Sequence, residues 1–358
     1  MIPLFENHPL LADKLPYVSL GAFPTPVHKL DRLGREMELG YLYVKRDDLS
    51  GKIYGGNKIR KLEFILGKAL RDGVEELLTF GLIGNRNALT TTICAEQLGM
   101  KCVCMMMPTF IDSQVRRNLL LTLHCGAELH HQPKMPLLVL DTVYQLFRHK
   151  LWCGSFPRFV SGRGFSISGV IGYVNAALEL KGQIVAGEIP EPDFIYVARG
   201  SSSTTVGLML GIRIASLNTR VISVGAYPQN YAFASKIARF YRKTACYLNS
   251  LDPSFPKFEY SEGDVAIRDG FVGKRNDYHM EERREAIDLM KKSEGVELDS
   301  IYTGRALACL IDDVRKGQLK NKVVLFWNTF NSRDFSDIIA AVDYRSMPHG
   351  FHRYFDGD

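Results

Sequence analysis

The 358-residue chain contains 46% hydrophobic and 23% charged residues, which is enough apolar material for a packed core and excludes a largely disordered protein. Its net charge of +6 is small, and basic residues are mixed with acidic ones in stretches such as 281–295, which disfavours a nucleic-acid-binding protein. No apolar run approaches the roughly 20 residues that cross a bilayer. The N-terminal sequence lacks the pattern of a signal peptide, so we expect a cytoplasmic protein without a membrane partner.

The seven cysteines point to reduced thiols. Their number is odd and they form no C-x-x-C pair, which disfavours a disulfide framework. Cys102 and Cys104 lie in an apolar run that reads as a buried strand. The histidines at 124, 130 and 131 cluster, but a strand would place the last two on opposite faces. No carboxylate spacing matches them, so we expect no metal site.

The first regular segment in chain order is YGGNKIRKLEFILGKALRDG (54–73). Apolar residues recur at helical spacing after Lys58, so this lysine is predicted to open a helix. Amides at a helix start attract anions, and the preceding glycines allow a planar ligand to approach. Burial and a neighbouring Arg60 or Lys61 would favour the neutral amine, which can form an imine with a carbonyl group. A solvated lysine in a turn is the alternative; a P-loop is excluded because asparagine stands where that motif has lysine.

Strands and helices then alternate. The pattern predicts a β-α-β-α-β unit between residues 74 and 131, and a second alternating series after residue 165, both typical of parallel sheets. Residues 247–280 are irregular and read as long loops, and the last fifteen residues read as a loose tail. The predicted strands are 75–80, 102–107, 128–131, 194–198, 221–226 and 322–327, and the predicted helices are 88–99, 113–126, 169–182 and 206–216.

A serine-rich turn follows one of these strands. FIYVA runs into Gly200, Ser201, Ser202, Ser203 and Thr204 before the next helix begins. Such a turn presents amide donors and the positive end of a helix dipole to a phosphate, at the sheet edge where α/β proteins bind ligands. Ordinary helix capping by serine remains the alternative. A nicotinamide dehydrogenase is disfavoured, because no G-x-G-x-x-G turn follows a strand.

Together these segments resemble pyridoxal-phosphate enzymes of the tryptophan-synthase-β-like fold, in the branch of D-cysteine desulfhydrase and 1-aminocyclopropane-1-carboxylate deaminase. The resemblance covers most of the chain. It implies two domains, each with three αβα layers around a twisted, mostly parallel sheet. The large cofactor-binding domain would comprise 1–64 and 165–358, and the small domain 65–164. The motifs that carry the resemblance are FPTPVHKL, YVKRDDLSG, YGGNKIRKLE, GYVNAALEL, GSSSTTVGL and DSIYTGRALACLIDDVRKG.

The resemblance also implies roles for individual residues. Lys58, after Asn57, would carry pyridoxal 5'-phosphate as an internal aldimine, and the turn from Gly200 to Thr204 would hold the phosphate. Lys61 and Tyr302 would border the substrate, and Thr303 or Thr329 would be the hydroxyl partner of the ring nitrogen. Taken alone, Tyr302 also reads as a packing residue and Thr303 as a helix cap.

The substrate-facing motifs depart from the family. The substrate-binding candidates Asn85, Arg86 and Asn87 stand where the family has Ser-Asn-His; Arg86 can bind a carboxylate or lie on the surface. Residues 274–277 replace a proline and glycines, which leaves open whether Tyr278 takes the role of the family's tyrosine. At 328–331, Asn-Thr-Phe-Asn replaces His-Thr-Gly-Gly, so we expect a pocket of different shape, and Phe165 replaces a serine.

These features predict a lyase or deaminase that acts on a small amino acid. Lys58 would remove the Cα proton, and loss of a β-substituent would give an oxo acid and ammonia. A β-replacement synthase, a racemase, or a cofactor-binding protein without turnover are the alternatives. By the same resemblance, the protein is expected to form a homodimer.

Overall fold

The computed structural model describes residues 1–161, 166–226, 232–271 and 280–356. The chain forms two compact units. The large unit contains residues 1–15, 21–64 and 165–333, and the small unit contains 16–20, 65–164 and 334–358. Within the described ranges, no helix combines the length and the apolar character that a membrane crossing requires.

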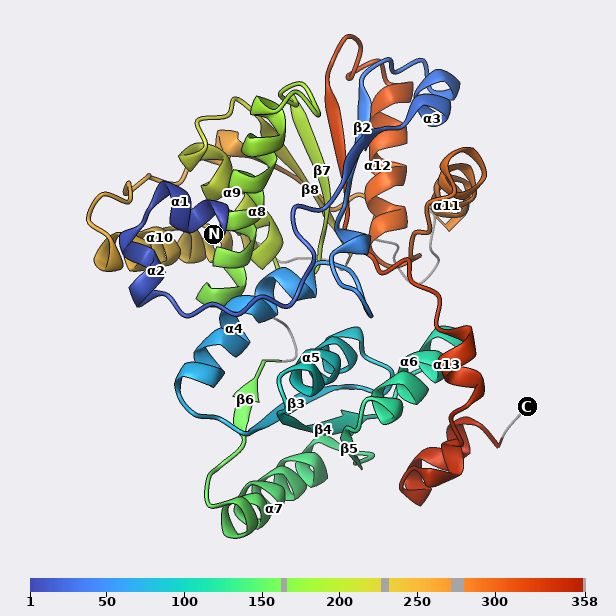
Figure 1. The fold of residues 1–358 in the computed structure, drawn as a ribbon. Coiled ribbons are helices and arrows are strands. Elements are labelled where there is room, and N and C mark those ends of the chain that lie inside the picture. The colour runs from blue at the N-terminus through green and yellow to red at the C-terminus, as the bar shows by residue number, and fades with distance from the viewer. Residues whose placement is uncertain (162–165, 227–231, 272–279, 357–358) are drawn as a thin grey trace. The chain divides into compact units, whose positions relative to one another are not determined.

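The large unit is built on a six-stranded sheet (Figure 1). Among the described strands, only the edge strand β1 pairs in antiparallel fashion, and the other neighbouring strands are parallel, as the alternating pattern predicts. In sheet order the strands are β1 (Val27–Lys29), β2 (Leu42–Arg46), β10 (Val324–Asn328), β7 (Phe194–Arg199), β8 (Arg220–Gly225) and β9 (Val265–Arg268).

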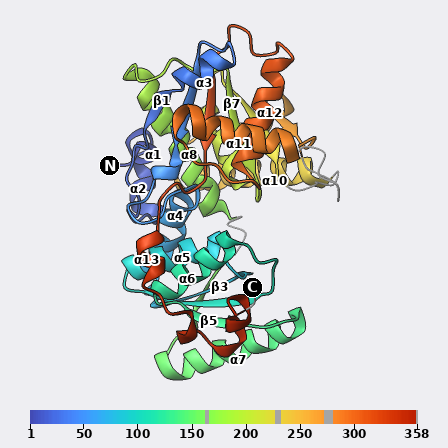
Figure 2. The same cartoon turned by 90° about the vertical axis from the view of Figure 1, so that its right-hand side faces the viewer.

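Helices cover both faces of this sheet, which makes the three predicted αβα layers. Figure 1 shows α8, α9 and α10 on one side and α11 and α12 on the other; Figure 2 views the second layer from the front. Apolar side chains of this second layer pack against strand residues such as Val44, Tyr196 and Phe326 to form a buried core. The helices of the unit are α1 (Pro3–Asn7), α2 (Leu10–Lys14), α3 (Asp31–Glu36), α8 (Ile167–Val185), α9 (Ser203–Ile214), α10 (Ala232–Leu251), α11 (Met280–Glu294) and α12 (Thr303–Arg315), together with the first residues of α4 (Lys58–Arg71).

The small unit has a parallel four-stranded sheet in the order β5-β4-β3-β6. Its strands are β3 (Glu76–Leu82), β4 (Lys101–Met107), β5 (Glu128–His131) and β6 (Arg158–Val160). Helices α5 (Arg86–Gln97) and α6 (Ser113–His124) follow the predicted positions, and Cys102 and Cys104 are buried in β4 as expected. The sequence did not predict the long helix α7 (Met135–Cys153), which packs on the sheet through Leu138.

Two predictions about irregular segments are wrong. Residues 247–280 are not all loop, because α10 extends to Leu251 and β9 closes one edge of the large sheet. The C-terminal residues are not a loose tail either. Phe351 and Tyr354 lie in a 3-10 helix (His349–Tyr354) and are buried, and the Tyr354 hydroxyl lies 2.9 Å from His131 Nε2.

The same contacts change the assignment of residues 334–358, which the sequence placed in the large domain. They belong to the small unit together with residues 16–20. Arg116 Nε donates a hydrogen bond to the carbonyl oxygen of Tyr354 (2.9 Å), and the Arg117 guanidinium lies 5.4 Å from the centre of the Phe335 ring. Phe335 precedes the short helix α13 (Ser336–Ala340).

Candidate active site

Lys58 is the first residue of α4. The loop before it, residues 50–57, is called the lysine loop and is held to the end of strand β10. The amide of Asn57 donates to the carbonyl oxygen of Thr329 (3.2 Å), and the amide of Gly55 donates to Asn331 Oδ1 (2.7 Å). Gly56 donates its amide to the carbonyl oxygen of Asp47 (2.7 Å). The loop therefore positions Lys58 through contacts with residues distant in sequence.

Two glycines in this loop are required by its geometry. Gly56 has φ +101°, in the left-handed region where a side chain causes strain. A Cβ at position 55 would lie 1.8 Å from the carbonyl oxygen of Asp48, far inside van der Waals contact. Alanine at position 55 would thus force the loop away from Asp48.

A buried charge network lies next to the lysine loop, and the sequence did not reveal it. Arg60 bonds to Asp47 (Nη2 to Oδ1, 2.7 Å) and to Glu179 (Nη2 to Oε1, 2.9 Å), and Lys45 Nζ lies 2.6 Å from Glu179 Oε1. All four side chains are buried. Burial raises the pKa of Glu179, but Arg60 and then Lys45 outweigh that effect and lower it to about 2. Glu179 is therefore ionised at neutral pH, and the two cations balance the two carboxylates.

Asp47 joins this network to the strands and helices around it. Its Oδ2 accepts hydrogen bonds from the Tyr173 hydroxyl (2.7 Å) and from Trp327 Nε1 (2.7 Å). Tyr173 is on α8 and Trp327 on β10, so one carboxylate links both elements to the turn that carries the lysine loop.

Lys61 lies one helical turn after Lys58 and is buried. Its Nζ is 5.6 Å from the centre of the Tyr173 ring. Burial lowers the pKa of Lys61 well below its ordinary value, and the charge of Lys58 lowers it further, against the opposing effect of Asp47. This environment favours a neutral amine, which can accept a proton.

The serine turn lies where β7 ends and α9 begins, and it has the properties of an anion site. Ser202 has φ +73° and precedes the first helical residue, Ser203. In the described part of the chain, the Ser202 hydroxyl oxygen is buried without a hydrogen-bond partner. Ser201 Oγ lies 3.2 Å from Ser203 Oγ, and Thr204 is also buried. A buried hydroxyl with an unused donor, beside the amides of a helix start, fits a phosphate group.

Tyr302 packs directly on this turn. Its Cε1 lies 2.9 Å from the position that a Cβ on Gly200 would occupy, so only glycine leaves room for the ring. Thr303, which follows, is fully buried and opens α12. Its Oγ1 accepts the amide of Asp299 (2.9 Å) and can still donate its hydroxyl proton. Asp299 Oδ1 in turn accepts the amides of residues 301–303, so Asp299 caps this helix.

Most of the predicted cofactor residues share one edge of the large sheet. Strands β10 and β7 are parallel neighbours, so Thr329 and Gly200 follow their carboxyl ends at the same edge. The lysine loop is bonded to Thr329, and Tyr302 covers Gly200. The structure thus brings Asn57, Lys58, the serine turn, Tyr302 and Thr329 to the carboxyl edge, where ligands bind in open α/β sheets.

The substrate-binding candidates Asn85, Arg86 and Asn87 lie at the start of α5 in the small unit. Asn85 Oδ1 accepts the amides of Asn87 (2.7 Å) and Ala88 (3.3 Å), so this side chain caps the helix. Asn87 is buried and its Nδ2 lies 3.4 Å from the carbonyl oxygen of Ser161. Arg86 is partly exposed. Tyr278, the changed residues 274–277 and Phe165 lie outside the described residues.

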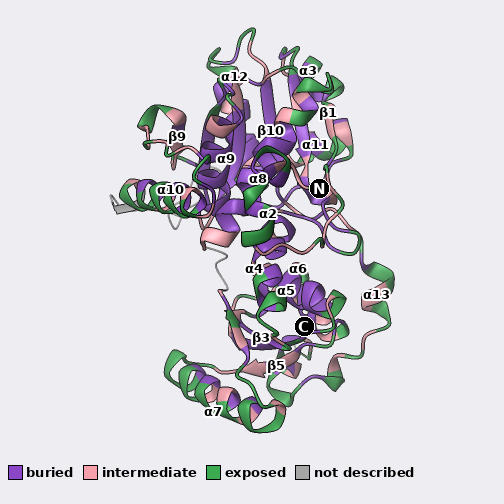
Figure 3. Cartoon of the chain, turned by 60° about the vertical axis from the view of Figure 1, so that its left-hand side comes forward, coloured by how far each residue is buried: buried purple, intermediate pink, exposed green. Residues whose placement is uncertain are grey.

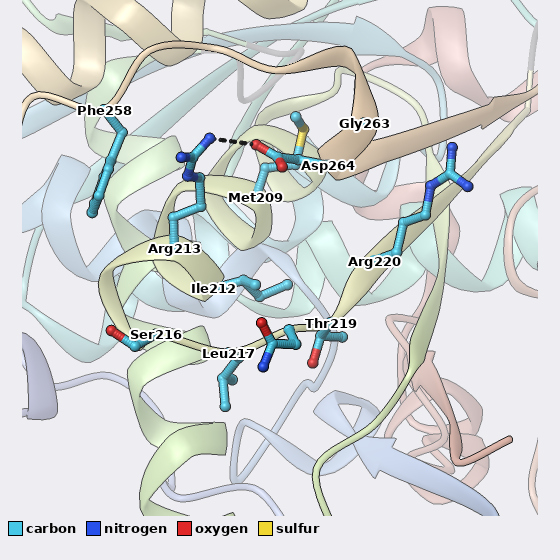
Figure 4. A pocket seen from close by; sticks show the side chains of 11 residues that line it. Met209, Ile212, Arg213, Ser216, Leu217, Thr219, Arg220, Phe258, Gly263 and Asp264 are labelled. Carbon is cyan, nitrogen blue, oxygen red and sulfur yellow. Dashed lines mark hydrogen bonds and ion pairs between the residues drawn. The ribbon is translucent and has the colours of Figure 1, made fainter.

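A surface cavity of about 470 Å³ lies at the other end of the large sheet (Figure 4). Thr219 and Arg220, at the start of β8, line it together with Arg213 near the end of α9. Arg213 Nη1 bonds to Asp264 Oδ2 (2.9 Å), so its charge is already balanced. Because the serine turn lies at the start of α9, this cavity is separate from the candidate active site.

Comparisons with known proteins agree with this arrangement. Residues 18–329 match the family model described as "Pyridoxal-phosphate dependent enzyme". A protein of Pyrococcus horikoshii with the provisional name 1-aminocyclopropane-1-carboxylate deaminase is 30% identical over 316 residues, which cover 88% of this chain and 91% of the relative. A D-cysteine desulfhydrase of Yersinia pestis is 30% identical over 330 residues, which cover 88% and 94%.

Solved structures give the same result. The structure of an ACC deaminase homologue superposes with a TM-score of 0.73 and 28% identity, and the match covers 95% of this chain and 98% of that one. A threonine deaminase from Solanum lycopersicum has a TM-score of 0.61 at 14% identity over 94% and 86% of the two chains, which shows a shared fold.

Proposed function

Because this chain belongs to the pyridoxal-phosphate dependent enzyme family, we propose that it is a lyase or deaminase acting on a small amino acid. In the proposed reaction the substrate loses its Cα proton and then a β-substituent, and the products are an oxo acid and ammonia. Family membership confirms the cofactor and the enzyme class that the motifs predict.

The observation that carries the proposal is the pairing of the lysine loop and the serine turn at one sheet edge. Lys58 would hold the cofactor covalently, Ser201 to Thr204 would bind its phosphate, and Thr303 or Thr329 would supply the hydroxyl partner of the ring nitrogen. The buried Ser202 hydroxyl, which has no hydrogen-bond partner among the described residues, supports this assignment. Pyridoxal phosphate, when bound, supplies an electron sink for the negative charge that develops at Cα.

The chain's own residues supply the proton transfers. Lys58 Nζ would take the proton from Cα. The hydrogen bonds that the Gly55 and Asn57 amides donate fix the start of the helix that carries this lysine. Lys61 stands as the second amine, with a lowered pKa that suits it to accept a proton and return it to the substrate. Tyr302, which packs on Gly200, would cover the phosphate end of the site.

A direct test is to scan the absorbance of the purified protein while titrating L- and D-amino acids, including D-cysteine, β-chloroalanine and phosphoserine, and to measure ammonia and oxo acid. We expect visible absorbance of the bound cofactor that changes with the true substrate, and product release that Lys58→Ala abolishes. The exposed Lys52, altered to alanine, is the matched control. A protein that binds the cofactor but turns over no amino acid in the panel would contradict the proposal.

The predicted homodimer receives support from the outer face of α7 (Figure 3). We infer that a second copy of the chain covers this face, whose exposed apolar side chains include Leu140 (67%), Phe147 (59%), Leu151 (84%) and Trp152 (84%). With Val143 and Tyr144 they offer on the order of several hundred Å² of apolar surface, since a buried aromatic side chain alone contributes ~150–250 Å². Each partner of a stable interface contributes ~800 Å², so this face would supply a large part of one.

A further inference from the structure

Helix α7 buries polar side chains and exposes apolar ones. Its buried positions are Leu138, Thr142, Gln145 and His149, spaced as one helical stripe that faces the small sheet. Cys153 extends the stripe by one further turn and is partly exposed. Two of these five positions, His149 and Cys153, carry a ring nitrogen and a thiol that can bind a metal ion, so the inner face of α7 is chemically unlike an ordinary core.

The last two residues of the stripe meet Glu76, the first residue of β3. His149 Nδ1 lies 2.8 Å from Glu76 Oε2, and Cys153 Sγ lies 3.1 Å from Glu76 Oε1. The possible ligand atoms of the three side chains all lie within 4.8 Å of one another. Glu76 and His149 are only 2% and 5% exposed, whereas Cys153 borders solvent, which leaves a route for an ion to enter.

We propose that Glu76, His149 and Cys153 form a binding site for one divalent transition-metal ion, with zinc as the best fit. Zinc is bound in proteins by imidazole, thiolate and carboxylate, and a histidine and a cysteine four residues apart on a helix present both ligands on one face. Ligand atoms about 3.4 Å apart surround a tetrahedral zinc ion. The separations of His149 and Cys153 from Glu76 would therefore need to widen by roughly 0.3–0.6 Å. Water would complete the coordination from the exposed side.

A carboxylate behind the histidine supports the site. His149 Nε2 lies 3.4 Å from Glu128 Oε2, and a metal-bound histidine commonly donates its second N–H to such a carboxylate. Glu128 Oε1 also lies 2.8 Å from His130 Nε2 and pairs with Arg148, so this carboxylate is already held in place behind His149. Glu128 would thus orient His149 with Nδ1 toward the ion.

Two cations lie close by. Lys101 Nζ is 3.6 Å from Glu76 Oε1, but this lysine side chain is 75% exposed and can turn into solvent. Arg148 Nη2 donates to His149 Nε2 (3.1 Å) and also pairs with Glu128, so Arg148 has to release this ring nitrogen before it can donate to Glu128. Without an ion, Lys101 partly balances the charge of Glu76. A divalent ion would replace Lys101 there.

Binding would be coupled to loss of one proton. The Cys153 thiol donates a hydrogen bond to Glu76 Oε1 (3.1 Å), so its proton has to leave before the sulfur can bind an ion. The ion would take the sulfur lone pair as the thiol proton leaves to solvent. The resulting thiolate and the Glu76 carboxylate together neutralise the two positive charges.

The test uses the full-length protein with its cofactor, purified without a polyhistidine tag, treated with a chelator and then exposed to zinc. After gel filtration, elemental analysis should find about one zinc per chain, and zinc should raise Tm and protect Cys153 from alkylation as read by mass spectrometry. The variants Cys153→Ser and His149→Gln keep the side-chain size or hydrogen bonding but lose a ligand, and should retain less than a tenth of that zinc. Cys246→Ser, at the exposed cysteine, is the matched control and should bind like the wild type.

Lys101→Met gives a second, independent readout. Removal of the competing cation should tighten zinc binding severalfold. Wild-type protein that retains no zinc would overturn the proposal. So would zinc that is retained equally by Cys153→Ser and His149→Gln, because it would then lie elsewhere.

Discussion

Asn331 Oδ1 accepts a hydrogen bond from the amide of Gly55 at 2.7 Å, across 276 positions of the chain. Both residues are buried. The family pattern has glycine at position 331, so in this protein a side chain stabilises the loop before Lys58. The asparagine therefore adds a contact to this loop that a glycine could not make.

Asn331→Ala should weaken cofactor binding by about 10-fold, because it leaves the buried Gly55 amide without its acceptor, a defect that costs about 1–3 kcal/mol. A titration of cofactor-free protein with pyridoxal phosphate would measure the Kd. The exposed Asn218, altered to alanine, is the control. An unchanged Kd in Asn331→Ala would show that the loop keeps its position without this bond.

Ser202→Ala should separate cofactor binding from stability. The Ser202 hydroxyl has no partner within the described residues, so its loss should leave the free energy of unfolding of cofactor-free protein nearly unchanged. Affinity for pyridoxal phosphate should fall about 10-fold or more, since a hydrogen bond to a charged group contributes about 1.5–3 kcal/mol.

The control for Ser202 is Thr205, whose Oγ1 lies 2.9 Å from Ser223 Oγ. Thr205→Ala should lower the free energy of unfolding by about 1 kcal/mol and leave cofactor affinity unchanged. Equal affinity in Ser202→Ala and the wild type would remove this hydroxyl from the phosphate site.

Glu179→Gln should destabilise the protein by about 3 kcal/mol at neutral pH, because it leaves Lys45 and Arg60 buried with one carboxylate fewer. The folded-state pKa of about 2 lies below the ordinary value of 4.5, so this carboxylate stabilises the fold above pH 4.5. That contribution is lost as the pH falls from 4.5 to about 2. Urea denaturation at several pH values should show this acid-dependent part in the wild type and in Glu36→Gln, and its absence in Glu179→Gln.

Lys61→Arg should lower kcat/KM by about 100-fold, in the range for loss of a proton-transferring group. Arginine stays charged, whereas the pKa of Lys61 is lowered by burial and by Lys58 so that the neutral amine is accessible. The wild-type rate should therefore fall as the pH drops below the lowered pKa. A pH profile of kcat/KM would detect this limb, and the exposed Lys68, altered to arginine, should retain it. A profile in Lys61→Arg that parallels the wild type would exclude Lys61 from proton transfer.

Charge on the outer face of α7 should dissociate the proposed dimer. We expect Leu140→Lys with Phe147→Lys to shift the molecular mass in analytical ultracentrifugation to that of one chain, because lysine amines resist burial in an apolar interface. Val185→Lys, an exposed apolar position in the large unit, should not do so. A double variant that remains dimeric would place the interface elsewhere.

The alternating apolar pattern was sufficient to predict most of the strands and helices around the site, because strand and helix periods differ and parallel sheets bury both faces. The lysine loop and the serine turn were predictable because each directly precedes a segment with helical spacing of apolar residues. The bond from Gly55 to Asn331 was not, since nothing in either segment specifies a partner so distant in sequence. The network of Lys45, Arg60 and Glu179 was missed because isolated charges within apolar runs normally lie on the surface.

Helix α7 shows a different limit of sequence analysis. A helical pattern with one apolar and one polar face is ordinarily oriented with the apolar face inward. In α7 the residues that face the sheet include Gln145 and His149, while Phe147 and Trp152 face outward. The sequence signal that could have indicated this is the number of large apolar residues in MPLLVLDTVYQLFRHKLWC, which exceeds what one helix can bury against a sheet of four strands.

The assignment of residues 334–358 to the small unit has a consequence for biosynthesis. The strands of that unit leave the ribosome well before Phe351 and Tyr354, which pack beside His131. The unit cannot reach its final packing until these later residues have also left the ribosome. A nascent chain stalled before residue 334 should therefore be cleaved by protease in the small unit more readily than the finished protein.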